Sequence, residues 1–214
     1  MRKYLWVFLS AVLILNSPSV FAGVAVTSVQ GEVSLARKYG QPEPVKKDSE
    51  IYSGDILKTA AGGSVDVSFY GNAGMRFDSA AEIVFTNTNP TKINLALNSG
   101  SLIARFKDKI PEGSSFEIET STAVLAVRGT QFWGQVISAG EKPVTSFAVR
   151  EGVLRITSKR DKKKYKLIKN QAIELTQDGP AMRRDAKPEE ITAIQESEKI
   201  KIMEGERWYK ETND

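Results

Sequence analysis

Two glutamates at alternate positions, Glu117 and Glu119, have a spacing that could support acid chemistry. They lie in the run 115–120, where they alternate with Phe116 and Ile118 in the period-2 pattern of a half-buried strand. Side chains two positions apart on one face of a strand are separated by roughly 7 Å, which a glycosidase can use. Simple alternation in a half-exposed strand explains the same residues without catalysis, so hydrolysis is the third of three functional hypotheses.

The chain contains no histidine and no cysteine. The usual nucleophile and base pairs and the standard ligands of zinc, copper and non-haem iron are therefore missing. The nearest string to an aspartic-protease motif is Asp78-Ser79-Ala80, no serine has a lysine three residues later, and no calcium loop or phosphate-cradling loop occurs. We predict a protein that is not an enzyme and uses no metal or other cofactor.

A basic residue next to a glycine, Arg128-Gly129-Thr130, interrupts an apolar run. Glycine permits a positive φ or a close backbone approach, and a guanidinium carries five donors in a fixed fork. The favoured prediction is that Arg128 is a buried, structural residue at a strand bulge. The alternative is that Arg128 contacts a partner.

The elements that position these residues are short strand-like runs separated by Gly, Asn, Asp and Ser. They cover residues 25–29, 32–37, 55–58, 64–70, 74–77, 82–86, 92–97, 101–106, 115–120, 123–127, 131–137, 144–149, 152–157, 164–168 and 171–176. This pattern predicts an all-β fold. Strand openings at Gly31, Gly100 and Gly152 favour a twisted β-solenoid or roll, with a β-sandwich as the alternative.

The N-terminus has the pattern of a secretory signal peptide. Arg2 and Lys3 precede an apolar run of about a dozen residues, and small residues lead to a cleavage site after Ala22. No later segment approaches the roughly 20 apolar residues of a membrane span, so we expect no transmembrane segment in the mature chain and a soluble, periplasmic protein. Removing Arg2 and Lys3 leaves 28 basic and 26 acidic residues, a net charge of +2 that does not favour nucleic acid.

A basic segment runs from Arg155 to Lys169, with eight basic residues and one acid. The cluster Lys162, Lys163 and Lys164 falls between two predicted strands, where a solvated hairpin tip is expected. The same cluster is also a candidate contact for an anionic envelope polymer or glycan.

The segment 177–214 differs in composition from the predicted β-domain at 24–176. Pro188 followed by two acids predicts a helix over about 188–203, with a thin apolar stripe suited to packing on the side of the β-domain. A detached, partner-binding helix is the alternative. Trp208 and Tyr209, among charges in the tail, are either docked or candidate contact residues.

The segment 116–132 resembles the signature of the FecR domain, a periplasmic module named after the regulator of iron-dicitrate uptake. The resemblance covers roughly residues 24–176, and its signature residues are Gly54, Asp55, Thr59, Gly100, Thr120, Arg128, Gly129, Thr130, Phe132, Glu151 and Gly152. Three turn positions depart from the family: Asn72-Ala73-Gly74 replaces an Asp-Gly turn, Ser121 a common Pro, and Asn170 a Gly. Asn tolerates the left-handed backbone next best to glycine, so only turn detail is affected.

The resemblance implies a β-solenoid or roll and a non-enzymatic domain that relays a signal through protein contacts in the envelope. The chain shows no cytoplasmic regulator segment of its own, so we expect a stand-alone FecR-domain protein that docks to another envelope protein. Peptidoglycan or anionic-polymer binding through the basic hairpin is the second hypothesis.

Overall fold

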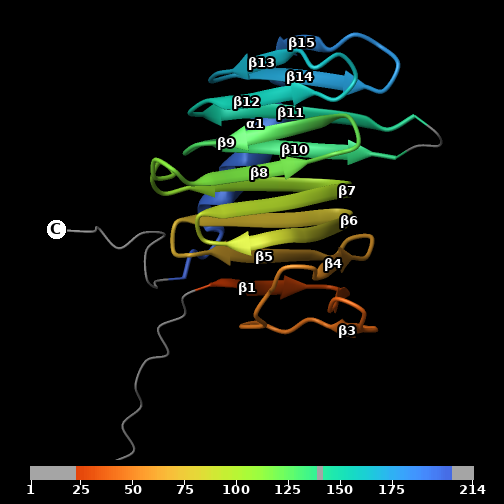
Figure 1. Cartoon of the computed structure of the whole chain (residues 1–214), viewed down its shortest axis with the longest axis vertical. Coiled ribbons are helices and arrows are strands. Elements are labelled where there is room, and N and C mark those ends of the chain that lie inside the picture. Colours follow the sequence, from red (N-terminus) through yellow and green to blue (C-terminus); the bar gives the residue numbers. More distant parts are fainter. Residues whose placement is uncertain (1–22, 139–141, 204–214) are drawn as a thin grey trace, which may run out of the picture.

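In the computed structural model, which describes residues 23–138 and 142–203, the chain forms one continuous sheet of 15 strands with a short helix near its C-terminus (Figure 1). The prediction of an all-β fold with one C-terminal helix is confirmed. The predicted signal peptide and the pair Trp208 and Tyr209 lie outside the described residues. Within the described part of the chain, no helix is long and apolar enough to cross a membrane.

A long antiparallel hairpin forms the centre of the sheet. It consists of β6 (Ala73–Asn89) and β7 (Lys92–Phe106). The pairing is interrupted between Asp78 and Glu82, and on either side of this interruption the hairpin has different neighbours. The hairpin therefore bends in the middle and starts two layers.

The two layers are named here by what covers their outer faces. The helix-side layer contains, in spatial order, β1 (Val24–Gln30), β5 (Ser64–Phe69), the first half of β6, the second half of β7, β10 (Gln131–Ile137), β11 (Val144–Glu151), β14 (Gln171–Thr176) and β15 (Met182–Asp185). The open layer contains β3 (Pro42–Pro44), β2 (Val33–Ala36), β4 (Ile56–Thr59), the second half of β6, the first half of β7, β8 (Ser115–Glu119), β9 (Ala123–Val127), β12 (Leu154–Ser158) and β13 (Lys164–Leu167). After the central hairpin, the chain adds further hairpins to the two layers in turn.

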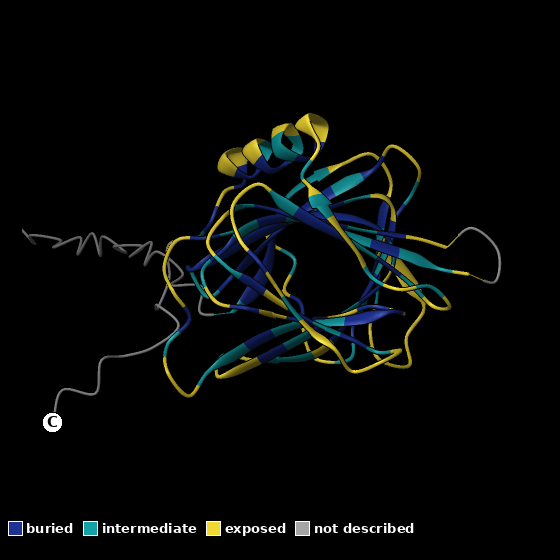
Figure 2. Cartoon of the chain, turned by 90° about the horizontal axis from the view of Figure 1, so that it is seen from above, coloured by how far each residue is buried: buried dark blue, intermediate teal, exposed yellow. Residues whose placement is uncertain are grey.

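Aromatic side chains join the two layers across the core. Phe69 of the helix-side layer packs edge-on against Phe116 of the open layer, with 5.3 Å between ring centroids. Phe106 meets the same Phe116 ring at 5.2 Å. Such edge-to-face pairs stabilise a core beyond the burial of their area. Figure 2, seen down the stack, shows the sheet curling round this core, which fits the predicted roll better than two separate sheets of a sandwich.

The outer face of the helix-side layer is covered by a C-terminal strap, residues 188–203. The strap contains α1 (Pro188–Gln195), a 3-10 turn η1 (Glu196–Lys199) and an extended end. Ile194 is fully buried against Ala148 and Ala172, in agreement with the predicted side-on packing. The helix is shorter than the predicted 188–203, because after Gln195 the backbone tightens into the 3-10 turn.

Polar contacts fasten the strap along its length. Arg184 makes a bidentate pair with Glu190 at 2.5 and 2.8 Å, and Arg150 pairs with Glu198 at 2.5 Å. Arg105 donates to the Ile200 carbonyl at 3.1 Å. Burial alone would raise the pKa of Glu190, but hydrogen bonds from Arg184 and from the Lys187 amide outweigh it and lower that pKa below its ordinary value of 4.5.

We expect the strap to loosen in acid. Because the pKa of Glu190 is lower in the folded state, its contribution is present above the ordinary pKa of 4.5 and is lost as the pH falls through the folded value. Glu190→Gln should cost roughly 1.5–3 kcal/mol at pH 7, the range for hydrogen bonds to charged groups, and progressively less as the pH falls below 4.5. Hydrogen exchange of the α1 amides against pH measures this. Glu189→Gln, with the same charge change one residue earlier, is the control, and an equal loss in both variants would contradict the prediction.

Candidate interaction surface

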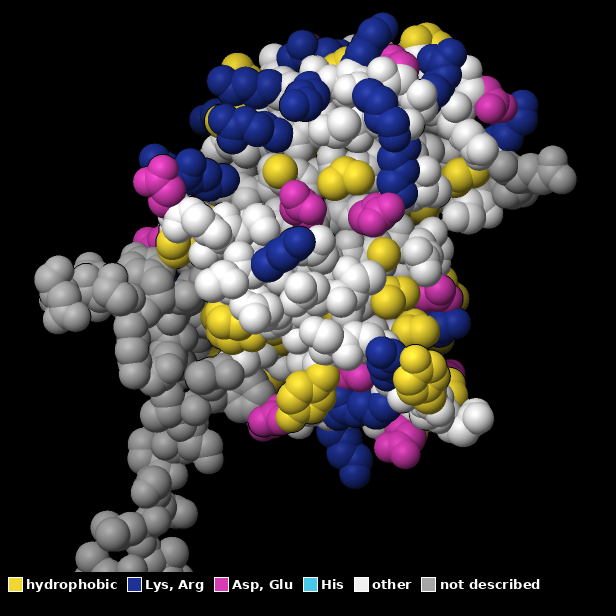
Figure 3. Space-filling view, viewed as in Figure 1, with side chains coloured by type: hydrophobic (Ala, Val, Ile, Leu, Met, Phe, Trp, Pro, Cys, Tyr) yellow, Lys and Arg dark blue, Asp and Glu magenta, His cyan; other side chains and the backbone are white. Residues whose placement is uncertain are grey.

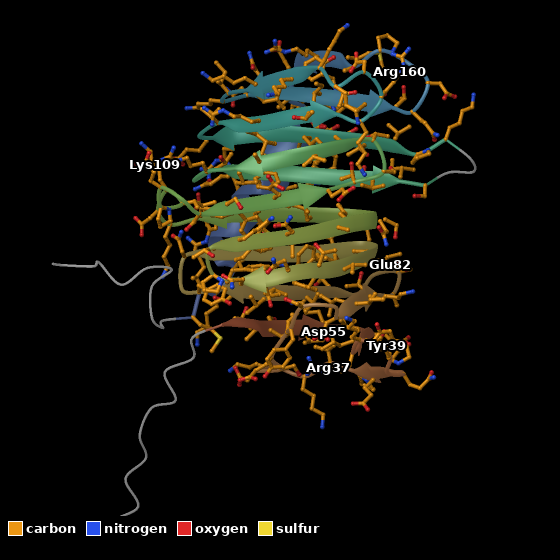
Figure 4. All side chains as sticks on the ribbon, viewed as in Figure 1. Arg37, Tyr39, Asp55, Glu82, Lys109 and Arg160 are labelled. Carbon is orange, nitrogen blue, oxygen red and sulfur yellow. The ribbon has the colours of Figure 1, made fainter. Side chains whose placement is uncertain are left out.

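Two signature residues, Gly54 and Asp55, lie in the turn before β4 in the open layer, and Figure 4 shows Asp55 at the lower end of the stack. The buried Asp55 carboxylate accepts hydrogen bonds from the Tyr52 amide at 2.9 Å and from Arg37 at 2.5 Å (Figure 4). Burial raises the pKa of Asp55, partly offset by Arg37. Gly54, with a φ of 95°, donates its amide to the Phe85 carbonyl at 2.7 Å. These contacts fasten the turn before β4 onto β6.

Thr59 and Gly100 stabilise the bend of the central hairpin. The Thr59 hydroxyl accepts a hydrogen bond from the Ala81 amide at 2.9 Å. Gly100 has a φ of 85° and lies directly under Ala81, so close that a Cβ atom on Gly100 would come within 2.3 Å of the Ala81 Cα. These two signature positions therefore belong to the fold.

The turns after β9 and after β11 pack against each other. The carbonyl of Gly129 lies where a Cβ atom on Gly152 would come within 2.4 Å of it, and the buried Thr130 hydroxyl donates to the Val153 carbonyl at 2.9 Å. Phe132, the next signature residue, is fully buried. Only glycine fits at 152, because any side chain would collide with the neighbouring turn.

The β8–β9 turn of the open layer makes a further contact with the helix-side layer. The buried Thr120 hydroxyl accepts hydrogen bonds from the Ala123 amide at 3.1 Å and from the Thr145 hydroxyl at 3.3 Å. It thereby closes the β8–β9 turn and ties the open layer to β11 of the helix-side layer.

Two further signature residues, Glu151 and Arg128, have exposed side chains. Glu151 lines a small depression with Lys107 and Lys109. The interpretation of Arg128 as a buried structural residue is wrong: its side chain is exposed and makes no hydrogen bond or ion pair with any described residue. It extends outward because it follows the alternation of β9, in which Leu125 and Val127 face the core.

The outer face of the open layer carries two adjoining depressions, which together are called the open-face groove. The larger is about 390 Å³ and the smaller about 160 Å³, and both are lined by Ala126 and Arg155. The register of the strands sets the order of the side chains that line the groove. Glu117 lies opposite Ala126, Ala126 opposite Arg155, and Arg155 opposite Lys166. One row of side chains therefore crosses four strands from an acid to two cations.

The charges of the groove are mostly unpaired. Arg128, Arg155, Lys164 and Lys166 have no acidic partner among the described residues, whereas the neighbouring Glu119 is paired with Lys159 at 2.5 Å. Val124 and Ala126 form a small apolar floor between these charges. The two glutamates considered as an acid pair thus have different surroundings, and Glu117 lies among cations.

The predicted basic hairpin tip is present. Lys162, Lys163 and Lys164 are exposed at the β12–β13 turn, where Lys162 has a φ of 58°. Figure 3 shows Lys and Arg side chains gathered over this upper end of the molecule. Asn170, at a position where the family has glycine, adopts a φ of 62°, as predicted. The described residues contain no group of three or more acidic side chains that could hold a metal ion.

Comparison with known proteins supports the resemblance. Residues 55–155 match the family model described as FecR protein. No curated protein matches the chain. Two crystal structures, at 1.65 and 2.50 Å resolution, of a "putative anti-sigma factor from Parabacteroides distasonis ATCC 8503" are 17% identical over 68% of this chain, with TM-scores of 0.45 and 0.43. The chain spans 63% and 62% of the lengths of these two structures, which is less than two thirds.

Proposed function

We propose that this chain, which carries a FecR domain over residues 55–155, is a non-enzymatic module that binds another protein at the cell envelope and takes part in a regulatory or signalling system. The observation that carries the proposal is the difference between its two faces. Its own strap covers the helix-side layer, while the open layer presents cations that pair with no described acid, around an apolar floor. Exposed apolar surface rimmed by charge is typical of an interaction surface.

The proposed location is the periplasm, after removal of residues 1–22. The sequence pattern of the N-terminus supports this location. Cleavage after Ala22 would also leave the sheet intact, since β1 begins at Val24 opposite Phe69 and the Gly23 carbonyl accepts the Tyr70 amide. The mature protein would then act through its contacts with a second envelope protein.

Affinity capture tests the proposal. Residues 23–214, crosslinked mildly in a cell-envelope extract, are expected to retain a specific protein partner. A chain ending at residue 203 is the matched variant: loss of the partner would place the contact at Trp208 and Tyr209, and retention would place it on the described surface. Recovery of no protein by either chain would contradict the proposal.

A second candidate, binding of peptidoglycan or another anionic envelope polymer, is favoured by the exposed basic tip. In the same extract it predicts retention on polymer that weakens steeply with salt, because exposed charges are screened over about 10 Å at 0.1 M. Neutralising Lys162, Lys163 and Lys164 should abolish that retention.

A further inference from the structure

The open-face groove carries a like-charge arrangement that the fold does not need. Arg155 of β12 and Lys166 of β13 are direct cross-strand partners, with both side chains exposed on the same face. Like charges directly opposite each other destabilise a sheet. No described acid is paired with either residue, and Glu117 lies two strands away from Arg155. Proteins tolerate such an unfavourable pair of like charges, with no neighbouring acid to offset it, mainly at functional sites such as binding surfaces.

The arrangement of the cations has a defined repeat. Lys164 and Lys166 are two residues apart on β13, so their side chains leave the same face at a spacing of roughly 7 Å. Arg128 directly follows the last residue of β9 and lines the smaller depression with Ala126 and Arg155. An extended peptide repeats its own side chains on one face at the same interval of roughly 7 Å. Carboxylates at alternate positions of a peptide aligned with β13 would therefore meet Lys164 and Lys166, and Arg155 lies directly beside Lys166.

The floor of the groove distinguishes between anionic partners. Val124 and Ala126 are small and apolar, and Ile156 and Tyr165 also line the larger depression. A ligand that carries only charged and hydroxyl groups would leave this apolar surface exposed to solvent. A peptide can cover it with its backbone and short apolar side chains. Of the three lysines at the hairpin tip, Lys162 and Lys163 line neither depression, whereas Lys164 lines the larger one.

From these observations we propose that the open-face groove binds an extended acidic segment of a partner protein, with carboxylates at alternate positions facing Lys164 and Lys166, and with Arg155 and Arg128 lining the same groove. The segment lies across the face of the sheet and adds no strand to its edge. This inference rests on the proposed function as a protein-binding module and names the surface and chemistry of the contact.

Binding of a labelled synthetic octapeptide of alternating glutamate and valine, at 0.15 M salt, tests the inference. Arg155→Glu and Lys166→Glu are each expected to weaken its affinity at least tenfold. Lys162→Glu and Lys163→Glu make the same charge change at the hairpin tip, outside the groove, and should change the affinity less than twofold. An octapeptide of alternating lysine and valine should not bind the parent protein.

A second readout separates binding from folding. Lys166→Glu places an acid opposite Arg155, so the melting temperature of the free protein should rise by about 1–3 °C. The same substitution should weaken binding of the acidic octapeptide. Loss of binding together with a lower melting temperature would overturn the inference, since damage to the fold would then explain it. Equal loss in groove and tip variants would overturn it too, because it would indicate an unspecific attraction to anionic polymer.

The envelope partner provides the final comparison. If parent protein captures a partner that Arg155→Glu and Lys166→Glu no longer capture, both the groove and the proposed function are supported. A partner captured equally by the groove variants refutes the groove and leaves the proposed function standing. If the parent protein binds the peptide but captures no protein, the proposed function fails while the peptide result still reports on the groove.

Discussion

Alanine at position 100 is expected to lower the free energy of unfolding by about 2–6 kcal/mol. The added Cβ atom would lie 2.3 Å from the Ala81 Cα and 2.6 Å from its amide nitrogen, and both are backbone atoms of the bend. Forced overpacking costs about 1–3 kcal/mol, and a non-glycine residue at a φ of 85° adds strain of similar size. Urea unfolding of Gly100→Ala against the parent protein measures the loss.

Gly113 provides the control for this prediction. It has nearly the same φ, 82°, but a Cβ atom there would meet nothing within 4 Å. Gly113→Ala should therefore cost only the backbone strain, about 1–3 kcal/mol. Equal losses for the two substitutions would mean that the close approach to Ala81 contributes nothing.

Removal of the Arg76 guanidinium is the second substitution with a large expected effect. Arg76 makes two hydrogen bonds to Asp66, at 2.6 and 2.8 Å, and the Asp66 residue is only 5% exposed. The pair raises the pKa of Arg76 and keeps it charged. Arg76→Met would leave a buried carboxylate without its partner, which typically costs about 3–5 kcal/mol. Thermal or urea unfolding at pH 7 measures the effect.

A double variant tests whether the uncompensated charge is the cause. Asp66→Asn added to Arg76→Met removes the stranded charge and keeps a side chain of nearly the same shape. The double variant should recover at least half of the lost stability. If it is as unstable as Arg76→Met alone, lost packing of the arginine stem would be the cause.

Much of the fold could be predicted from the alternation of apolar residues. The runs 123–127, 131–137 and 171–176 have the same bounds as the observed strands. Two strands were missed, Pro42–Pro44 and Met182–Asp185. Both are almost wholly exposed edge strands, so they carry no apolar alternation to detect.

The continuity of the central strands could not be predicted either, because the bend changes the pattern. In β7, Ile93, Leu95 and Leu97 face the core, but after Gly100 the inward positions are even-numbered, beginning with Leu102. In β6, Ser79 and Ala80 have positive φ angles, which cannot be predicted from either residue type. Each long strand therefore looks like two short ones.

The candidate surface was predicted only in part. The signature identified Arg128 but suggested burial, because an arginine inside an apolar run was assigned to the fold. Arg155 and Lys166 were counted in the basic segment without being singled out. The register of the β12–β13 hairpin brings these two together, and a prediction of that register from its turn would have found them.

Hairpins are added to the two layers in turn, and within the described part of the chain no further strand pairs with the outer edges of β13 and β15. Each hairpin added there contacts mainly its immediate neighbours, as repeats do in elongated repeat proteins. The architecture can therefore lengthen by one hairpin at a time without rebuilding its centre. Duplications near this end are the natural route by which such a protein would gain length in evolution, whereas an insertion into the β6–β7 hairpin would disconnect both layers at once.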